Sequence, residues 1–208
     1  MRKLVLLVTV VLVVGVSARA QHPRVEIFGG YSYANLDEGL FPLSSLSGRR
    51  NASGWGANLS LNSSRFFGFT ADFAGQFGNV QILDPTLACI GIFPPPPGCT
   101  IDVNFSSQQF LFGPRFILRG GGATGFVHVL LGATRTRLSS FPTFGGLVPA
   151  QTETDFALAA GGGLDVRLSP FLALRAFQVD YIPVHQGGII NQDFAQNIRV
   201  QTGIVLRF

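Results

Sequence analysis

The last twelve residues of the chain alternate between two kinds of side chain with a period of two. One set is mainly apolar: Ile198, Val200, Thr202, Ile204, Leu206 and Phe208. The other set carries the charges: Asn197, Arg199, Gln201, Gly203, Val205 and Arg207. Because successive side chains of a strand point to opposite faces, this pattern predicts a β-strand with one apolar face.

The same alternation recurs in seven further segments. They cover approximately residues 24–34, 53–62, 66–78, 105–117, 125–137, 155–168 and 171–182. Almost nothing else in the chain is available to cover so many apolar faces, so we expect the sheet to close on itself and its apolar faces to meet lipid. The predicted fold is all-β: an eight-stranded antiparallel up-and-down transmembrane β-barrel.

Two of the predicted strands are irregular. Arg175 and Asp180 are an odd number of residues apart, so both point inward only if a β-bulge lies between them. Pro114 lies in the middle of the strand at 105–117, where proline removes a ladder hydrogen bond. For Pro114 both a kink and a bulge remain open.

The first 20 residues have the organisation of a secretory signal. Arg2 and Lys3 precede an apolar run of 13 residues, and Ala18-Arg19-Ala20 supplies a cleavage pattern. The run is shorter than the roughly 20 residues that a membrane-spanning helix needs. We therefore predict a signal peptide at residues 1–20 and a barrel domain at residues 21–208.

Removal of the signal changes the charge balance. The formal net charge of the whole chain is +4, but the remainder holds 12 basic and 11 acidic residues and no lysine. This near-neutral balance gives no support for nucleic-acid binding. Only 12% of the residues are charged, against about 25% in ordinary soluble domains. No apolar stretch after the signal is long enough for a membrane-spanning helix.

Turns and longer connections alternate between the predicted strands. Short turns are expected at residues 62–65, 119–124 and 169–170, and longer connections at 35–52, 79–104, 138–154 and 183–194. Outer-membrane barrels have short periplasmic turns and longer outer loops. The second long connection contains Cys89 and Cys99, which we predict to form a disulfide in an oxidising compartment, with free thiols as the alternative.

These features together resemble the small eight-stranded outer-membrane β-barrel family of the OmpA/OmpX type. The segments that carry the resemblance are residues 28–33 (FGGYSY), 112–116 (FGPRF), 128–132 (HVLLG) and 203–208 (GIVLRF). The resemblance implies a bacterial cell outer-membrane location, contact with outer-membrane lipid and lipopolysaccharide, and a monomeric state. It also implies that Ile204, Leu206 and Phe208 form a signal for the barrel-assembly machinery.

The predicted inward faces collect nine charged residues. They are Glu26, Asp72, Arg115, Asp165, Arg167, Arg175, Asp180, Arg199 and Arg207. An eight-stranded barrel is just filled by side chains, and unpaired buried charges are costly, so we predict a paired charge network in the lumen. Glu26 is a candidate partner for Arg199 and Arg207 where the first and last strands meet. A narrow ion path and a ligand cavity are the alternatives.

No catalytic constellation emerges from the sequence. The three histidines are His22, His128 and His185, and none has a serine at the spacing of a lipid-A deacylase. The glycine clusters do not connect a strand to a helix, so they are not phosphate loops. We therefore predict a protein that is not an enzyme and has no cofactor or metal.

The expected role is structural or interactive: membrane integrity, adhesion or lipid contact. Arg135 and Arg137 lie on the predicted lipid-facing side near the outer end of their strand, where they are candidates for contact with lipopolysaccharide phosphates. The first alternative is a narrow, porin-like pore or small-solute channel. The second is a soluble lipocalin-like binding barrel, which requires apolar side chains inside and charges outside.

Overall fold

The computed structural model describes residues 23–36, 50–83, 100–143, 146–185 and 194–208. The described residues form ten strands and contain no helix long and apolar enough to cross a membrane. Eight strands make the barrel: β1 (Val25–Leu36), β2 (Arg50–Asn62), β3 (Phe67–Leu83), β4 (Thr100–Arg119), β5 (Ala123–Leu138), β8 (Gln151–Arg167), β9 (Leu172–His185) and β10 (Phe194–Arg207). The remaining two, β6 (Phe141–Thr143) and β7 (Gly146–Val148), form a separate hairpin.

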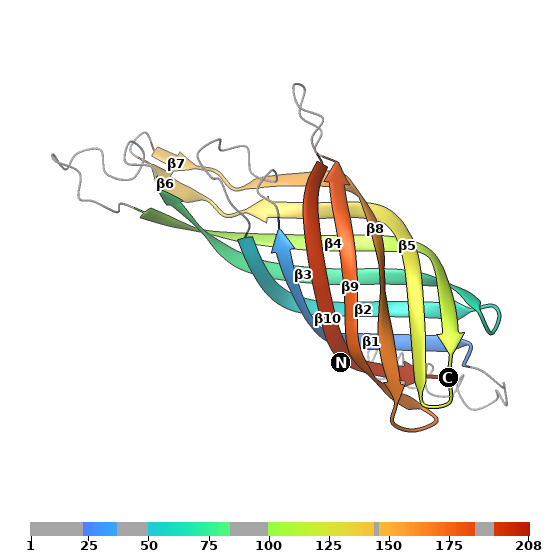
Figure 1. The fold of residues 1–208 in the computed structure, drawn as a ribbon. Helices are drawn as coiled ribbons and strands as arrows, with labels where there is room; N and C mark the ends of the chain where they lie inside the picture. The colour runs from blue at the N-terminus through green and yellow to red at the C-terminus, as the bar shows by residue number, and fades with distance from the viewer. Residues whose placement is uncertain (1–22, 37–49, 84–99, 144–145, 186–193) are drawn as a thin grey trace, which may run out of the picture.

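The eight strands close into one barrel in which each strand pairs antiparallel with its neighbour along the chain (Figure 1). β1 and β10 complete the ring, with Glu26 opposite Arg207. Backbone hydrogen bonds between Val25 and Phe208 extend this seam to the end of the chain. The predicted eight-stranded antiparallel barrel is therefore confirmed.

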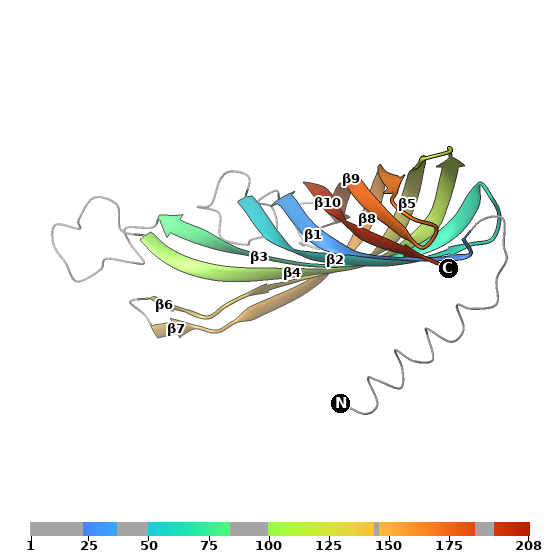
Figure 2. The same ribbon diagram turned by 90° about the horizontal axis from the view of Figure 1, so that it is seen from below.

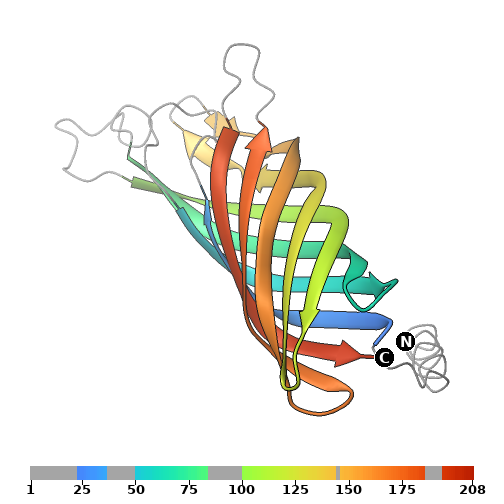
Figure 3. The ribbon, with the colours of Figure 1, turned by 45° about the vertical axis from the view of Figure 1, so that its right-hand side comes forward.

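The two ends of the barrel differ. Tight turns after β2, β4 and β8 gather at the end that also holds the last residue of the chain, which we call the short-turn end (Figure 3). The opposite end, the long-loop end, carries a sheet extension. There the pairing of β3 with β4 continues as far as Leu83 and Thr100, and the β6–β7 hairpin prolongs β5 and β8 (Figure 2).

This extension corrects two predicted connections. Residues 79–83 and 100–104 are strand rather than loop, and so are most of residues 141–154. In β4 the reason is that the alternation changes phase: Val103 and Phe105 are apolar on the inward face, whereas Phe110 and Phe112 are apolar on the outward face.

The barrel is apolar outside and polar inside. Its outer surface exposes aromatic and aliphatic side chains, including Tyr31, Trp55, Phe77, Phe112, Phe156, Tyr181 and Ile204. Its lumen buries most of the charged residues that the alternation placed there. A lipocalin-like barrel has the opposite arrangement, so that alternative is wrong. Lipid is the solvent that such an exterior requires.

The predicted bulge lies in β9. Gln178 pairs with Gln201 and Arg175 with Gly203, so two residues of β9, Ala176 and Phe177, oppose one residue of β10. Both bulge residues are exposed, and Arg175 and Asp180 on either side of them are buried. The bulge restores the inward direction of both charges, as predicted.

Pro114 interrupts the β4 ladder without a bulge. Phe112 pairs with Leu131 and Arg115 with His128, which is the same register on both sides of the proline. Of the two possibilities left open for Pro114, the bulge is therefore excluded.

Glycines on the inner face of β8 make room for lumen side chains. A Cβ atom at Gly161 would collide with Asp180 Oδ1, and one at Gly163 would lie 2.8 Å from the ring of Phe126. The glycine cluster therefore shapes the lumen.

Candidate functional site: the charged lumen

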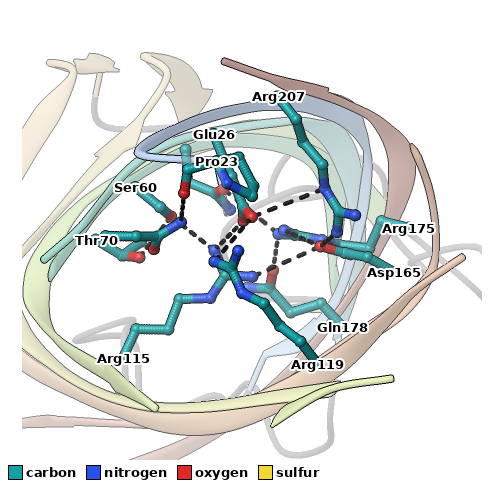
Figure 4. A network of polar contacts seen from close by, with 12 residues as sticks. Pro23, Glu26, Ser60, Thr70, Arg115, Arg119, Asp165, Arg175, Gln178 and Arg207 are labelled. Atoms are coloured by element: carbon teal, nitrogen blue, oxygen red, sulfur yellow. Dashed lines mark hydrogen bonds and ion pairs between the residues drawn. The ribbon is translucent and has the colours of Figure 1, made fainter. Parts of the chain in front are cut away.

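Six charged residues gather in the lumen near the short-turn end. We call them the turn-end cluster: Glu26, Arg115, Arg119, Asp165, Arg175 and Arg207 (Figure 4). Arg115 Nη1 donates to Glu26 Oε2 and to Ser60 Oγ, both at 2.9 Å. Arg115 therefore ties β4 to β1 and β2 across the lumen.

Asp165 is the second anionic centre of the turn-end cluster. Arg175 Nε donates to Asp165 Oδ1 at 2.8 Å, and Arg207 Nη2 donates to Oδ2 at 3.5 Å. Arg115 Nη2 lies 3.6 Å from the same Oδ2. One carboxylate thus links β8 to three other strands.

Phe126 on β5 lies between two of these arginines. The guanidinium carbon of Arg115 is 4.0 Å from the ring centroid, and that of Arg175 is 4.5 Å away. Arg175 also stacks on Phe28 at 4.3 Å. Cation–π contact of a desolvated arginine contributes about 2 kcal/mol, so these rings orient the guanidinium groups as well as fill space.

A second group lies farther toward the long-loop end. We call it the loop-side cluster: Asp72, Gln109, His128, Asp180 and Arg199. Arg199 lies between two carboxylates, with Nη1 2.7 Å from Asp72 Oδ1 and Nη2 2.7 Å from Asp180 Oδ2. Its Nη1 also donates to Gln109 Oε1 at 3.0 Å. His128 Nε2 lies 2.8 Å from Asp180 Oδ1.

Amide side chains connect the two clusters. Arg175 Nη1 donates to Gln178 Oε1 at 2.6 Å, and Gln178 Nε2 donates to Asp180 Oδ2 at 2.8 Å. Asn58 accepts from Arg175 at 3.4 Å and donates to Asp72 at 3.3 Å. The polar network is therefore continuous from Glu26 to Asp72.

Apolar side chains fill the lumen beyond the loop-side cluster. This apolar layer comprises Ala34, Leu36, Ala52, Val103, Phe105, Leu138, Ala157, Ile182, Val184 and Ala195. All of them share the inward parity of the charged residues on their strands. Apolar side chains therefore replace charged ones in the part of the lumen nearer the long-loop end.

Solved structures with the same architecture come from bacterial outer membranes. Ail, the attachment invasion locus protein of Yersinia pestis, is 18% identical with a TM-score of 0.56, over 90% of this chain and all of that one. Neisserial surface protein A is 11% identical with a TM-score of 0.58, over 91% and 100% of the two chains. OprG from Pseudomonas aeruginosa is 14% identical with a TM-score of 0.55, over 90% and 97%. This chain has the fold of the small outer-membrane β-barrels. No family model and no curated protein sequence matches it.

Within this outer-membrane-barrel fold, eight of the nine predicted lumen charges are buried and belong to the two clusters. Arg167 is the exception. It shares the parity of Asp165 but is the last residue of β8, so its side chain is exposed at the barrel mouth and forms none of the ion pairs found among the described residues. The prediction that Arg167 belongs to the charge network in the lumen is therefore wrong.

Of the two ion pairs predicted for Glu26, with Arg207 and with Arg199, the structure contains only the first among the described residues. Arg207 Nε lies 3.7 Å from Glu26 Oε1 across the β1–β10 seam. Arg199 pairs instead with Asp72 and Asp180, because it lies farther from the short-turn end than Glu26 does. The sequence reading missed Arg119, whose strand continues two residues beyond the predicted end.

The other predicted sites are on the outside of the barrel or beyond the described residues. Arg135 and Arg137 are exposed on β5 near the long-loop end. Ile204 and Leu206 face outward, and Phe208 is half-buried beside the seam. The signal at residues 1–20 and the Cys89–Cys99 pair lie outside the described residues.

Proposed function

We propose that this protein is an outer-membrane barrel with a structural or surface-interaction role, and that its lumen does not conduct. The observation that carries the proposal is the filled lumen. Arg115, Arg175 and Arg199 cross it with at most 1% of their surface exposed, and the apolar layer follows them toward the long-loop end. Such a barrel is a structural component of the membrane that presents the sheet extension at its long-loop end for contact.

The proposed orientation has the short-turn end in the periplasm and the sheet extension outside the cell. Short periplasmic turns and long outer loops support this direction. β4 has 20 residues, although a barrel strand needs only about 9–11 to cross a bilayer. The excess length therefore projects from the membrane and is available for contact.

Surface contact is the role that the extension fits best. Ail is the attachment invasion locus protein of Yersinia pestis, and a second structure of it is a complex with the heparin analogue sucrose octasulfate. In the present chain, Arg135 and Arg137 lie on the outward face of β5 where the extension begins. We infer that these two arginines meet lipopolysaccharide phosphates at the membrane border, where charge is inexpensive.

Planar-bilayer recording tests the closed lumen. The refolded barrel is expected to give no discrete conductance steps. A narrow pore is the competing function, because the continuous polar network would supply a path if its ion pairs exchanged partners. Stepwise conductance that disappears on substitution of Arg115 or Arg199 would establish the pore and overturn the proposal.

Charge reversal tests the lipopolysaccharide contact. The double variant R135E/R137E should bind less lipopolysaccharide or lose stability in lipopolysaccharide-containing membranes. The matched control is R65E, which reverses an exposed arginine at the short-turn end. Equal behaviour of R135E/R137E and the unmodified barrel in both assays would exclude this contact and leave the barrel assignment intact.

A further inference from the structure

The turn-end cluster has unequal numbers of charges. Four arginines, Arg115, Arg119, Arg175 and Arg207, surround two carboxylates, Glu26 and Asp165. Further exposed arginines, including Arg65 and Arg167, lie within electrostatic range of Arg119 at the same barrel mouth. The short-turn end of the lumen therefore holds an excess of about two positive charges within a confined space, where they attract anions.

Five buried guanidinium nitrogen atoms of this cluster have no hydrogen-bond acceptor among the described residues. They are Nε and Nη2 of Arg115, Nε and Nη2 of Arg119, and Nε of Arg207. Arg119 Nη2 and Arg207 Nε lie 3.6 and 3.7 Å from Glu26 Oε1, which is too long for hydrogen bonds. Glu26 Oε1 likewise lacks a hydrogen-bond partner among the described residues. A single carboxylate oxygen accepts too few hydrogen bonds for five donor nitrogens, and buried polar groups are normally satisfied, so the cluster has room for a further acceptor.

The geometry of the cluster favours a ligand in the guanidinium planes. Arg115 has one face against Phe126, which leaves the edge of its fork free to donate. Arg119 and Arg207 approach Glu26 from two other strands, as Figure 4 shows. The side chains of Arg119 and Arg207 are 9% and 4% exposed, against 1% for Arg115, so Arg119 is the member of these three nearest to the solvent at the short-turn end.

We propose that the turn-end cluster is a binding site for a small tetrahedral oxyanion of the phosphate or sulfate type, which enters through the short-turn end. The oxyanion accepts hydrogen bonds from Arg119, Arg207 and Arg115. Its charge of about −2 offsets the excess positive charge of the cluster. Guanidinium forks match the oxygens of such anions in both geometry and charge.

Calorimetric titration with inorganic phosphate tests the proposal directly. The refolded barrel is kept in uncharged maltoside micelles, and sodium chloride holds the ionic strength constant. We expect saturable binding, together with a rise in the thermal unfolding midpoint as phosphate occupies the folded state. The variant R119Q, which removes one donor at the accessible rim, should bind about tenfold more weakly or worse.

Two further variants separate a built site from general attraction to positive charge. R65Q makes the same charge change at an exposed position of the same barrel mouth, outside the cluster, and should weaken phosphate binding much less than R119Q does. E26Q removes the carboxylate that competes with the anion and should tighten binding. The proposal is overturned if folded wild-type barrel shows no saturable binding, if R119Q and R65Q give equal isotherms, or if folded E26Q binds more weakly.

Discussion

Arg199 illustrates how single residues hold this barrel together. It is fully buried, and it lies between Asp72 on β3 and Asp180 on β9, opposite walls of the lumen. Removing one member of a buried ion pair leaves the other member desolvated and uncompensated. Two carboxylates, on opposite walls of the barrel, pair with this one guanidinium, so its removal would leave both of them without this cation.

We expect R199M to destabilise the barrel by about 3–5 kcal/mol, because both carboxylates stay buried without their cation. Urea unfolding in lipid vesicles measures the change in the free energy of unfolding. The control R135M removes an exposed arginine and should change it by no more than about 0.5 kcal/mol. Equal stabilities of R199M and R135M would refute the structural role of the pair.

Gly161 provides a second residue-scale test. A methyl group there would collide with Asp180 Oδ1 in the loop-side cluster, so G161A should cost about 1–3 kcal/mol through overpacking. G29A is the matched control, because a Cβ atom at Gly29 meets nothing within 4 Å. The same unfolding assay reports both variants, and a neutral G161A would show that the lumen adjusts more freely than its packing indicates.

At this scale, alternation predicted which charges point inward, but not which of them pair. The pairing of Arg199 with Asp72 depends on the stagger between strands that are not neighbours in the barrel, and no local pattern records that stagger. The contact of Phe126 with Arg175 has the same origin, because β8 lies between β5 and β9. Arg167 was placed wrongly because parity carries no information about how close a residue is to the barrel mouth.

At the scale of elements, β9 depends on its bulge. Ala176 and Phe177 occupy two consecutive outward positions, which places Arg175 and Asp180 on the same face although their spacing is odd. Without the extra residue, one of these charges would have to face lipid. A charged side chain near the bilayer midplane costs roughly 2–4 kcal/mol, in addition to the lost ion pairs.

Deletion of Ala176 should therefore prevent stable folding, since it shifts one half of β9 by one residue. Heat-modifiability on gels measures the outcome, because a folded barrel and a boiled one migrate differently. A176V keeps the residue count and changes only an exposed side chain, so it should fold normally. A folded deletion variant of unchanged stability would show that β9 can move its bulge elsewhere.

The sequence predicted the existence and type of all eight barrel strands, because each has one face toward lipid and one toward the lumen. It did not predict the outer ends of β3 and β4, because most of the apolar residues there have the opposite parity to those that face outward in the rest of each strand. The paired residues Val80 and Val103 lie in a stretch expected to be loop. Cross-strand pairing, which continues to Leu83 and Thr100, defines the sheet there.

At the scale of the whole molecule, the barrel and the β6–β7 hairpin are separable. β6 pairs with β7 in a sheet of its own. Leu138 pairs with Gln151 just before the hairpin, so the barrel ladder is complete without it. The barrel carries the stability, and the hairpin is an addition at the long-loop end.

Replacing residues 141–148 by an Asn-Gly turn should leave heat-modifiability and the unfolding free energy of the barrel nearly unchanged. Removal of eight residues within β5, 127–134, is the contrasting deletion and should abolish folding, because it breaks the ring. If loss of the hairpin unfolds the barrel as well, the two parts are one cooperative unit. Changes in the hairpin sequence would then alter the stability of the barrel.

The seam between the first and last strands has a consequence for assembly. Glu26 and Arg207 face each other there, on the first and last strands of the barrel, and Glu26 also contacts Arg115 on β4. In an open eight-stranded sheet, Glu26 and Arg207 would lie on free edges and would lose each other as counter-ions, although Asp165 and Arg175 on neighbouring strands could still pair. The contact between Glu26 and Arg207 therefore forms only after the last strand has docked on the first. While it is formed, lipid cannot enter between the two strands without exposing ions that lipid cannot solvate.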